Sequence, residues 1–349
     1  MTAEVLRREP PPAPADATSR GLAERVFRIR ESGIVVVLAL FIAVTAGLQH
    51  RFLSASNIQF VLVNTVIFAL LALGETMVVV ARHVDLSVGS VLGMSAYLSA
   101  SLFGRHPGIP LPFVFLVGLG IGLGWGIVNG LLVAAGRVPS LVVTLASLYI
   151  IRGIDILIVG GGMVTANTLP SAFTDIPKET VLGIPYVAIV VAVVVAAGAY
   201  YLRSFRSGRD LYAIGSNPAA AKLAGIPIGR RVFMAFAASG AIAGVAGVLW
   251  AAQYGTVDST AGTGYELTVV TAVVVGGVAI FGGSGSAVGA ALGALLLATI
   301  NSALYVLGIS SFWDQAIAGF LLIFAITLDR VISVRLTEAL RIRSSRRAA

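Results

Sequence analysis

Blocks of about 20 apolar residues recur along the chain, separated by short polar or glycine-rich stretches. Each block is about as long as a helix that crosses a hydrocarbon core of roughly 30 Å. Several contain glycine or are flanked by proline, so we expect some spans to be broken or re-entrant. The pattern predicts an all-α polytopic membrane protein with about ten transmembrane helices. They are expected at roughly 33–49, 57–80, 87–104, 111–135, 140–160, 184–202, 231–252, 266–282, 286–306 and 312–332.

The composition agrees with this pattern, because 57% of the 349 residues are hydrophobic and only 11% are charged. A soluble domain carries about 25% charged residues. The segment 33–332 is therefore expected to form a single transmembrane domain. The polar, proline-containing segment 1–32 is not typical of a cleavable signal peptide and is expected to be a largely disordered tail. The absence of cysteine excludes disulfides and cysteine–metal sites.

The basic residues predict the orientation in the membrane. With a cytoplasmic N-terminus and ten spans, 20 of the 24 Lys and Arg residues fall on the cytoplasmic side, which is the usual bias of membrane proteins. They cluster in the tail 1–32, the loop 203–231 and the basic tail 333–349. Both termini are therefore expected to be cytoplasmic. The net charge of +8 reflects this topology, so no nucleic-acid partner is predicted.

Small residues recur at four-residue spacing inside several spans. One stripe comprises Gly118, Gly122, Gly126 and Gly130, a second comprises Gly285, Gly289 and Gly293, and a shorter one comprises Gly240 and Gly244. Such stripes let helices approach closely in lipid, where burial of apolar surface does not drive association. They predict a tightly packed bundle without specifying a function.

Enzyme chemistry is not predicted for this chain. An ATP-binding loop needs a lysine followed by serine or threonine. The two lysines do not fit, because Lys178 precedes Glu179 and Lys222 precedes Leu223. No catalytic, cofactor-binding or metal-binding residues are assigned. If transport is driven by ATP, hydrolysis is expected on a separate ATPase subunit.

Polar residues within or beside the spans are candidates for a pathway or gate, because charge at membrane depth is costly and tends to face a cavity or a partner. Glu75, Asn129, Arg152, Asp258, Glu266 and Asn301 are the candidates, and Asn64, Asp155 and Asp314 are further polar residues in or near spans. The alternative is that most of them lie at span ends or cap helices.

Residues 81–90 form a polar turn followed by a predicted helix start. Asp85 is placed to accept backbone N–H groups there, and its charge suits the positive end of the helix dipole. A direct contact with a solute or gate is the other interpretation.

A short helix is predicted at 217–225, inside the loop 203–231. Asn217 or Ser216 can cap its start, and Pro218 fits its first turn. Alanines follow, and Gly225 offers a stop. A helix this short is unstable alone in water, so it should be held by neighbours or by a partner.

Three segments resemble the permease subunits of ribose-type ATP-binding-cassette importers. They are ALGETMVVVARHVDLSVGSVLG at 72–93, GRDLYAIGSNPAAAKLAGI at 208–226 and GTGYELTVVTAVVVGGVAIFGGSGSAVGAALGA at 262–294, with a weaker match, TLASLYIIRG, at 144–153. Arg82 and His83 stand where many ribose-type members have two glycines. Together with TAGTGYE at 260–266, this pair looks more like the rhamnose or autoinducer-2 branch.

The resemblance implies a complex of two permeases, identical or related, and two ATPase subunits that carry ATP and Mg. A periplasmic solute-binding protein would deliver a sugar or sugar-like solute, and the permease would lie among the lipids of a bacterial inner (plasma) membrane. It also implies an ATPase-coupling helix and a signature turn. The former comprises Asn217, Pro218, Ala220, Ala221, Leu223 and Gly225, and the latter comprises Asp85, Leu86, Ser87 and Gly89.

Two other functions stay open. An ion-coupled secondary transporter would need a committed intramembrane charge, for which Glu75 is the candidate. A membrane scaffold protein would not need the capped helix in the loop 203–231.

Overall fold

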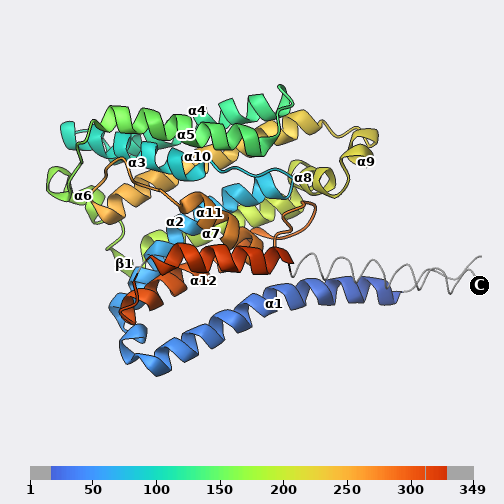
Figure 1. Ribbon diagram of the computed structural model, residues 1–349, viewed down its shortest axis with the longest axis horizontal. Helices are drawn as coiled ribbons and strands as arrows, with labels where there is room; N and C mark the ends of the chain where they lie inside the picture. The colour runs from blue at the N-terminus through green and yellow to red at the C-terminus, as the bar shows by residue number, and fades with distance from the viewer. Residues whose placement is uncertain (1–16, 311, 328–349) are drawn as a thin grey trace, which may run out of the picture.

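The computed structural model describes residues 17–310 and 312–327, with side chains from residue 33 onward. The predicted tail 333–349 and residues 1–16 of the predicted N-terminal tail lie outside this range. Residues 17–32 form the first half of the first helix. Helices dominate the described chain (Figure 1). In order they are α1 (Ala17–Leu48), η1 (His50–Leu53), α2 (Ala55–Val79), α3 (Val88–Arg105), α4 (Leu111–Ala134), α5 (Ser140–Val159), η2 (Ala166–Thr168), α6 (Ser171–Thr174), α7 (Tyr186–Ser204), α8 (Arg206–Ser216), α9 (Pro218–Leu223), α10 (Ile228–Tyr254), α11 (Tyr265–Val275) and α12 (Ala287–Val306). An unlabelled helix, Trp313–Thr327, follows.

The prediction of an all-α polytopic membrane protein is confirmed. Six helices, α2, α4, α5, α7, α10 and α12, are long and apolar enough to cross a membrane. Gly33–Leu48 of α1, α11 and Trp313–Thr327 are shorter apolar helices. The only sheet in the described part of the chain is a small antiparallel hairpin of β1 (Thr180–Val181) and β2 (Ile184–Pro185).

The predicted span 266–282 is wrong in its second half. Helix α11 ends at Val275, and residues 276–286 form no helix before α12 begins. The paired glycines 276 and 277 account for the break, because Gly277 adopts a left-handed conformation with φ 92° that favours glycine. Hydropathy does not register this break, because the residues that follow it remain apolar.

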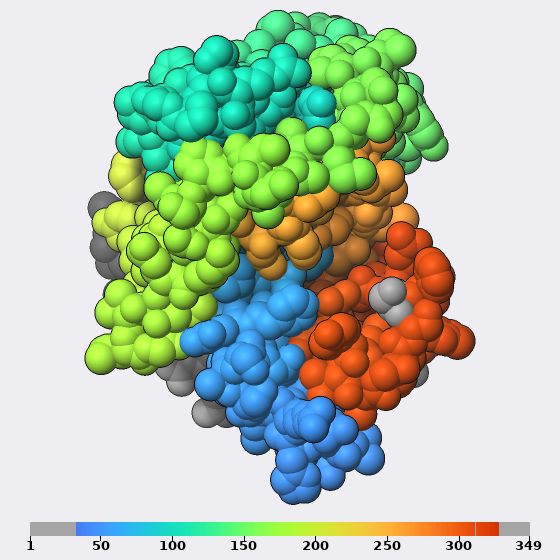
Figure 2. Space-filling view, turned by 90° about the vertical axis from the view of Figure 1, so that its left-hand side faces the viewer, coloured from blue at the N-terminus to red at the C-terminus, as the bar shows by residue number. Residues whose placement is uncertain are grey.

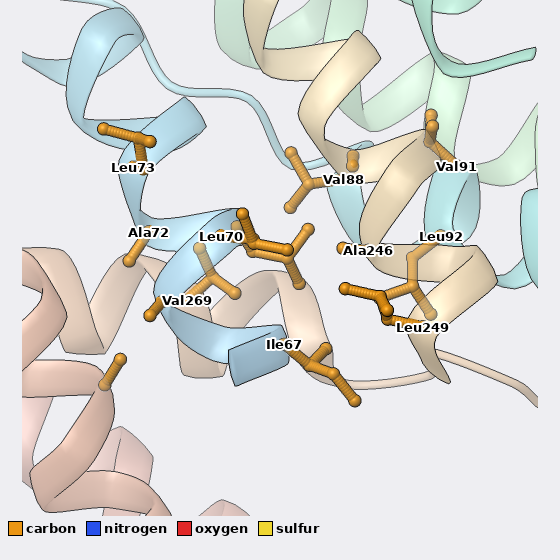
Figure 3. Close-up of a cluster of buried hydrophobic side chains, with 14 of the residues drawn as sticks. Ile67, Leu70, Ala72, Leu73, Val88, Val91, Leu92, Ala246, Leu249 and Val269 are labelled. Atoms are coloured by element: carbon orange, nitrogen blue, oxygen red, sulfur yellow. The ribbon is translucent and has the colours of Figure 1, made fainter. Parts of the chain in front are cut away.

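Helix α10 forms the centre of the bundle, packing along α4 and against α3 and α2. Figure 3 shows part of this core, in which Leu70 of α2, Leu92 of α3, Leu249 of α10 and Val269 of α11 gather in one cluster. Exposed apolar side chains instead cover the outer faces of α4, α5 and α7, where lipid is the natural solvent. The core is therefore formed by helices that are well separated in the sequence.

The glycine stripes lie at two close helix contacts, as expected of a tightly packed bundle. Gly118 and Gly122 of α4 face Gly244 and Gly240 of α10, where an added Cβ atom would collide with the opposite backbone. Gly289 and Gly293 of α12 make equally close contacts with the chain at Ala272 of α11 and at Gly276, the residue after α11. These contacts hold α4 against α10 and α12 against α11 at distances that larger side chains would not allow.

The bundle has two distinct ends in Figure 1. The α9 end carries α8 and α9, and both α1 and the C-terminal helix have their outer termini on this side. The hairpin end carries α6, β1 and β2, and a pair of hydrogen bonds of 2.9 Å between Val164 and Val257 joins its loops. Figure 2 looks onto the hairpin end.

Candidate functional site

A polar network lies inside the bundle at the break between α2 and α3. Residues 80–87 connect the two helices without helical structure of their own. The Glu75 side chain accepts a hydrogen bond of 3.1 Å from the backbone N–H of Asp85. The Oδ1 atom of Asp85 accepts from the backbone N–H and the hydroxyl of Ser87, at 3.0 and 2.6 Å. The turn is thereby closed on itself just before α3 begins at Val88.

This network connects the break to three other helices. The Asn129 side chain on α4 donates to the Ser87 hydroxyl at 2.8 Å and accepts from Ser147 of α5 at 2.6 Å. From α10, Ser239 donates to Asp85 Oδ2 at 3.4 Å. Each of these side chains is at most 3% exposed. The network therefore ties the broken segment to the centre of the bundle.

Within this network, the Glu75 carboxylate has an oxygen atom whose hydrogen bonding is not satisfied. It is fully buried, and its Oε2 atom has no hydrogen-bond partner. No ion pair reaches Glu75 or Asp85 in the described part of the chain. A buried carboxylate that lacks a counter-charge and has one unsatisfied oxygen is costly, so Glu75 marks a place where a proton, a cation or a second conformation would be stabilising.

A second cluster lies toward the hairpin end, around Arg152 of α5. Its guanidinium donates to the backbone carbonyls of Ser259 at 3.2 Å and Ala261 at 2.7 Å. Asp155 and Glu266 lie close enough to interact with this charge electrostatically. Both Asp155 carboxylate oxygens and Glu266 Oε2 are buried without hydrogen-bond partners. Arg152 thus holds the loop 255–264 onto the bundle.

That loop also carries a fixed negative charge. The backbone N–H and hydroxyl of Thr260 donate to Asp258 Oδ1 at 2.8 and 2.6 Å. These hydrogen bonds lower the pKa of Asp258 below its ordinary value. Asp258 is therefore ionised at neutral pH on the surface of the hairpin end.

The α9 end carries the short helix that the sequence predicts. The Asn217 side chain caps α9 by accepting from the backbone N–H of Ala220 at 3.1 Å, and Pro218 occupies its first turn. Gly225 adopts a left-handed φ of 75° just beyond it. Leu223 is 91% exposed, although its side chain is apolar.

Helix α8, which precedes α9, packs onto both helix breaks. Gly215 fits so closely against Val80 and Gly283 that an added Cβ atom would overlap both backbones. The two breaks are themselves joined, because Gly283 donates its N–H to the Val80 carbonyl at 2.9 Å. The Tyr212 hydroxyl donates to the Gly285 carbonyl at 3.1 Å. Burial raises the pKa of Tyr212 to about 12, which keeps that donor protonated.

We call this contact among α8, the 80–87 break and the 276–286 break the glycine junction. It lies at the α9 end, and the polar network begins on the same broken segment, at Asp85. The junction cannot be predicted from local patterns, because its residues come from three separate stretches of the sequence. The positive φ angles of Gly282 and Gly283, both 81°, belong to loops that only the fold brings beside α8.

The predicted pathway residues do not form one site. Glu75 and Asn129 belong to the polar network, whereas Arg152, Asp258 and Glu266 lie toward the hairpin end. Asn301 is separate and hydrogen-bonds Asp314 of the C-terminal helix.

In the signature turn, Leu86 is half-buried, and Gly89 leaves room for Glu266, whose Oε2 would collide with a Cβ atom there. The serines 147 and 239 are missed by sequence analysis, since serine is common in apolar helices.

The fold is that of an all-α polytopic membrane protein, and a family model identifies the kind of membrane protein. Residues 57–326 match the model for the branched-chain amino acid transport system / permease component. The match covers most of the chain, so the protein belongs to this family of permease components.

Two kinds of relative are similar over nearly the whole chain. The autoinducer 2 import system permease protein LsrC of Enterobacter sp. (strain 638) is 36% identical over 307 residues, 88% of each chain. The ribose import permease protein RbsC of Escherichia coli (strain K12) is 32% identical over 303 residues, 86% of this chain and 94% of the relative. No solved structure matches the chain. The predicted resemblance and the predicted class, the permease subunit of an importer, are confirmed.

Proposed function

We propose that this chain forms the solute path of an ATP-binding-cassette importer for a sugar or sugar-like solute in a bacterial inner membrane. The observation that carries the proposal is the similarity to ribose and autoinducer 2 import permeases, which extends over 86–88% of the chain. Arg82 and His83 in the break, and the sequence TAGTGYE at 260–266, favour a solute of the rhamnose or autoinducer-2 kind over ribose. Two copies, or this chain and a related one, would enclose the path.

The α9 end fits a cytoplasmic ATPase partner, which would bind ATP and Mg. Helix α9 is too short to be stable in isolation, yet only Ala221 among its residues is buried against the bundle. Its exposed Leu223 would be covered by a cleft on the ATPase subunit. The glycine junction would then pass a displacement of α8 and α9 directly to both helix breaks.

The hairpin end fits the docking of a periplasmic solute-binding protein. Its loop 255–264 is held in place by Arg152 and by the Val164–Val257 bridge. Asp258 adds a fixed negative charge at this surface. Charge reversal with Asp258→Lys should weaken docking of the binding protein, and unchanged docking and transport would indicate an ordinary surface loop.

Reconstitution tests the proposal. The permease, its ATPase subunits and the binding protein are placed in proteoliposomes, and uptake of radiolabelled D-ribose and autoinducer 2 is measured with and without ATP. We expect uptake that needs ATP, needs the binding protein and persists when an ionophore collapses ion gradients.

An ion-coupled secondary transporter is the second candidate, and the unpartnered Oε2 atom of buried Glu75 is the observation that favours it. This mechanism requires uptake that the ionophore abolishes and that continues without ATP. Glu75→Gln should then eliminate transport, whereas an ATP-driven permease should keep ion-independent uptake in that variant.

A further inference from the structure

Half-buried aromatic side chains gather where α2, α10 and α11 meet near the hairpin end. Trp250 and Tyr254 lie one turn apart on α10, with ring centroids 4.5 Å apart. The Tyr265 ring lies 4.8 Å from that of Phe68 on α2, and its hydroxyl accepts from the Trp250 indole N–H at 3.1 Å. The four rings therefore form two packed pairs joined by one hydrogen bond, although they come from three helices.

Amide side chains border these aromatic rings. The Oδ1 atom of Asn64 accepts from the Tyr254 hydroxyl at 2.9 Å and from the Gln253 amide at 3.2 Å. The Gln253 Oε1 atom is buried and has no hydrogen-bond partner. A free amide oxygen beside aromatic rings provides an acceptor that a hydroxyl group can satisfy. We call Asn64, Phe68, Trp250, Gln253, Tyr254 and Tyr265 the aromatic–amide cluster.

The charge around the cluster favours a neutral solute. No Lys or Arg contributes to any hydrogen bond or ion pair of the cluster within residues 33–310 and 312–327. The carboxylate that acts electrostatically on both Tyr254 and Tyr265 is that of Asp314. An anion would have no counter-charge here, whereas hydroxyl groups can donate to amide and carboxylate oxygens and pack their C–H faces on aromatic rings.

The position of the cluster suits a solute on its way through the permease. In Figure 2 the orange segment, which includes the end of α10 and α11, lies at the centre of the hairpin end, below the green segments and above the blue and red ones. Tyr254 is 42% exposed, and the other cluster members are buried or half-buried. Tryptophan and tyrosine also gather at membrane surfaces as lipid anchors. An anchoring belt does not require the mutual hydrogen bonds that link these side chains.

We propose that the aromatic–amide cluster is a contact site for a neutral polyhydroxylated solute, with the rings as a stacking surface and Gln253 Oε1 as the open acceptor. The inference rests on the proposed import function and adds to it the residues that touch the solute. It also assigns a role to Trp250, Gln253, Tyr254 and Tyr265, none of which belongs to the polar network.

Fluorescence of Trp250 tests binding without relying on transport. The chain contains three tryptophans, so Trp125→Phe with Trp313→Phe leaves Trp250 as the single reporter. The full chain in detergent is titrated with D-ribose and, separately, with autoinducer 2. We expect a saturable change with at least one of them. Gln253→Leu should weaken the affinity about three- to tenfold, as expected for loss of one hydrogen bond.

Tyr149→Phe is the matched control, because Tyr149 is 69% exposed on α5, away from the cluster. It should leave the titration unchanged, and Tyr265→Phe should weaken it. Absence of any saturable change with either probe, in a protein whose reconstituted complex transports one of them, overturns the inference and indicates a lipid-anchoring belt. Saturable binding in a complex that transports neither probe would overturn the import function and leave the contact site standing.

Discussion

At the scale of single residues, Asp85 has the clearest structural role. The sequence predicts that Asp85 accepts backbone N–H groups near a helix start, and the structure shows it accepting one from Ser87, two residues on. Its partners outside this turn could not be predicted. Ser239 is 154 residues away in the sequence, and its hydroxyl gives no signal in an apolar helix.

Substitutions at Asp85 separate its hydrogen-bonding from its charge. Asp85→Asn keeps an acceptor for Ser87 and can donate its amide to the Ser239 hydroxyl, so the permease should fold and retain much of its transport. Asp85→Leu leaves buried donors unpaired, each costing about 1–3 kcal/mol. Its abundance in the membrane and its thermal midpoint in detergent should both fall. An abundant Asp85→Leu protein that does not transport would instead assign Asp85 to the path.

At the scale of helices and loops, local signals predicted α9 well, because its cap, its first-turn proline and its glycine stop lie within nine residues. Local signals do not indicate α8, because its sequence is typical of a polar loop. Its buried side includes Asp210, which pairs with Arg231 of α10 at 2.8 Å. The place of α8 against the bundle depends on this long-range contact and on the glycine junction.

The contact between α4 and α10 gives a prediction about packing. Gly122 faces the backbone of α10, whereas Gly124, on the same helix, has no neighbouring atom within 4 Å of a Cβ position. Gly122→Val should destabilise the protein by at least about 1–3 kcal/mol, because the side chain forces the helices apart. Thermal unfolding in detergent measures this. Gly124→Val is the control, and equal midpoints for the two variants would contradict the close contact.

Helix α9 gives a prediction about coupling. Ala220 is exposed, and glutamate is a good helix former, so Ala220→Glu should leave the permease folded and inserted. It should nevertheless prevent ATPase association or uncouple hydrolysis from uptake, because a bulky charge enters the proposed interface. Co-purification of the ATPase subunit and ATP-dependent uptake measure the effect. Leu182→Glu, on the 99% exposed tip of the β1–β2 hairpin, controls for insertion. Normal coupled transport in Ala220→Glu would refute the coupling role.

The glycine junction can be tested separately from α9. Gly215→Ala places a methyl group against the Val80 carbonyl and Gly283, so α8 should separate from the two breaks. The ATPase should still bind α9, but its hydrolysis should no longer drive uptake. Gly229→Ala, near the start of α10, meets only Ala134 O at an ordinary 3.6 Å and serves as the control. If Gly215→Ala transports with normal coupling, the junction does not transmit the displacement.

At the scale of the whole molecule, the basic-residue bias predicts which end faces the cytoplasm. The chain lacks cysteine, so single-cysteine variants can be labelled without background. Leu182 at the hairpin end and Leu223 on α9 are 99% and 91% exposed, which makes both accessible to a reagent. An impermeant maleimide added to whole spheroplasts should label Leu182→Cys and leave Leu223→Cys unlabelled until the membrane is opened. The opposite pattern would invert the proposed topology.

Hydropathy was sufficient to predict the helical class and the approximate place of each apolar segment. It could not show that α11 stops at Val275, nor that the two non-helical stretches meet. Hydropathy also gives no sign that Trp250 and Tyr265 are in contact. Their hydrogen bond exists only because the fold brings α10 and α11 together. Sites built from one stretch of sequence were therefore predictable, and sites built across helices were not.

The hydrogen bonds of Arg152 have a consequence for the biosynthesis of the protein. Its acceptors, the carbonyls of Ser259 and Ala261, are synthesised 107 and 109 residues after it. Helix α5 must therefore enter the bilayer carrying a positive charge in the half that lies toward the hairpin end, before any part of the loop that receives it exists. Placing an arginine within a span is unfavourable during insertion. The charge reaches its partners only when α10 has crossed the membrane and returned the chain to the same side, so the hairpin end of the permease is assembled late in translation.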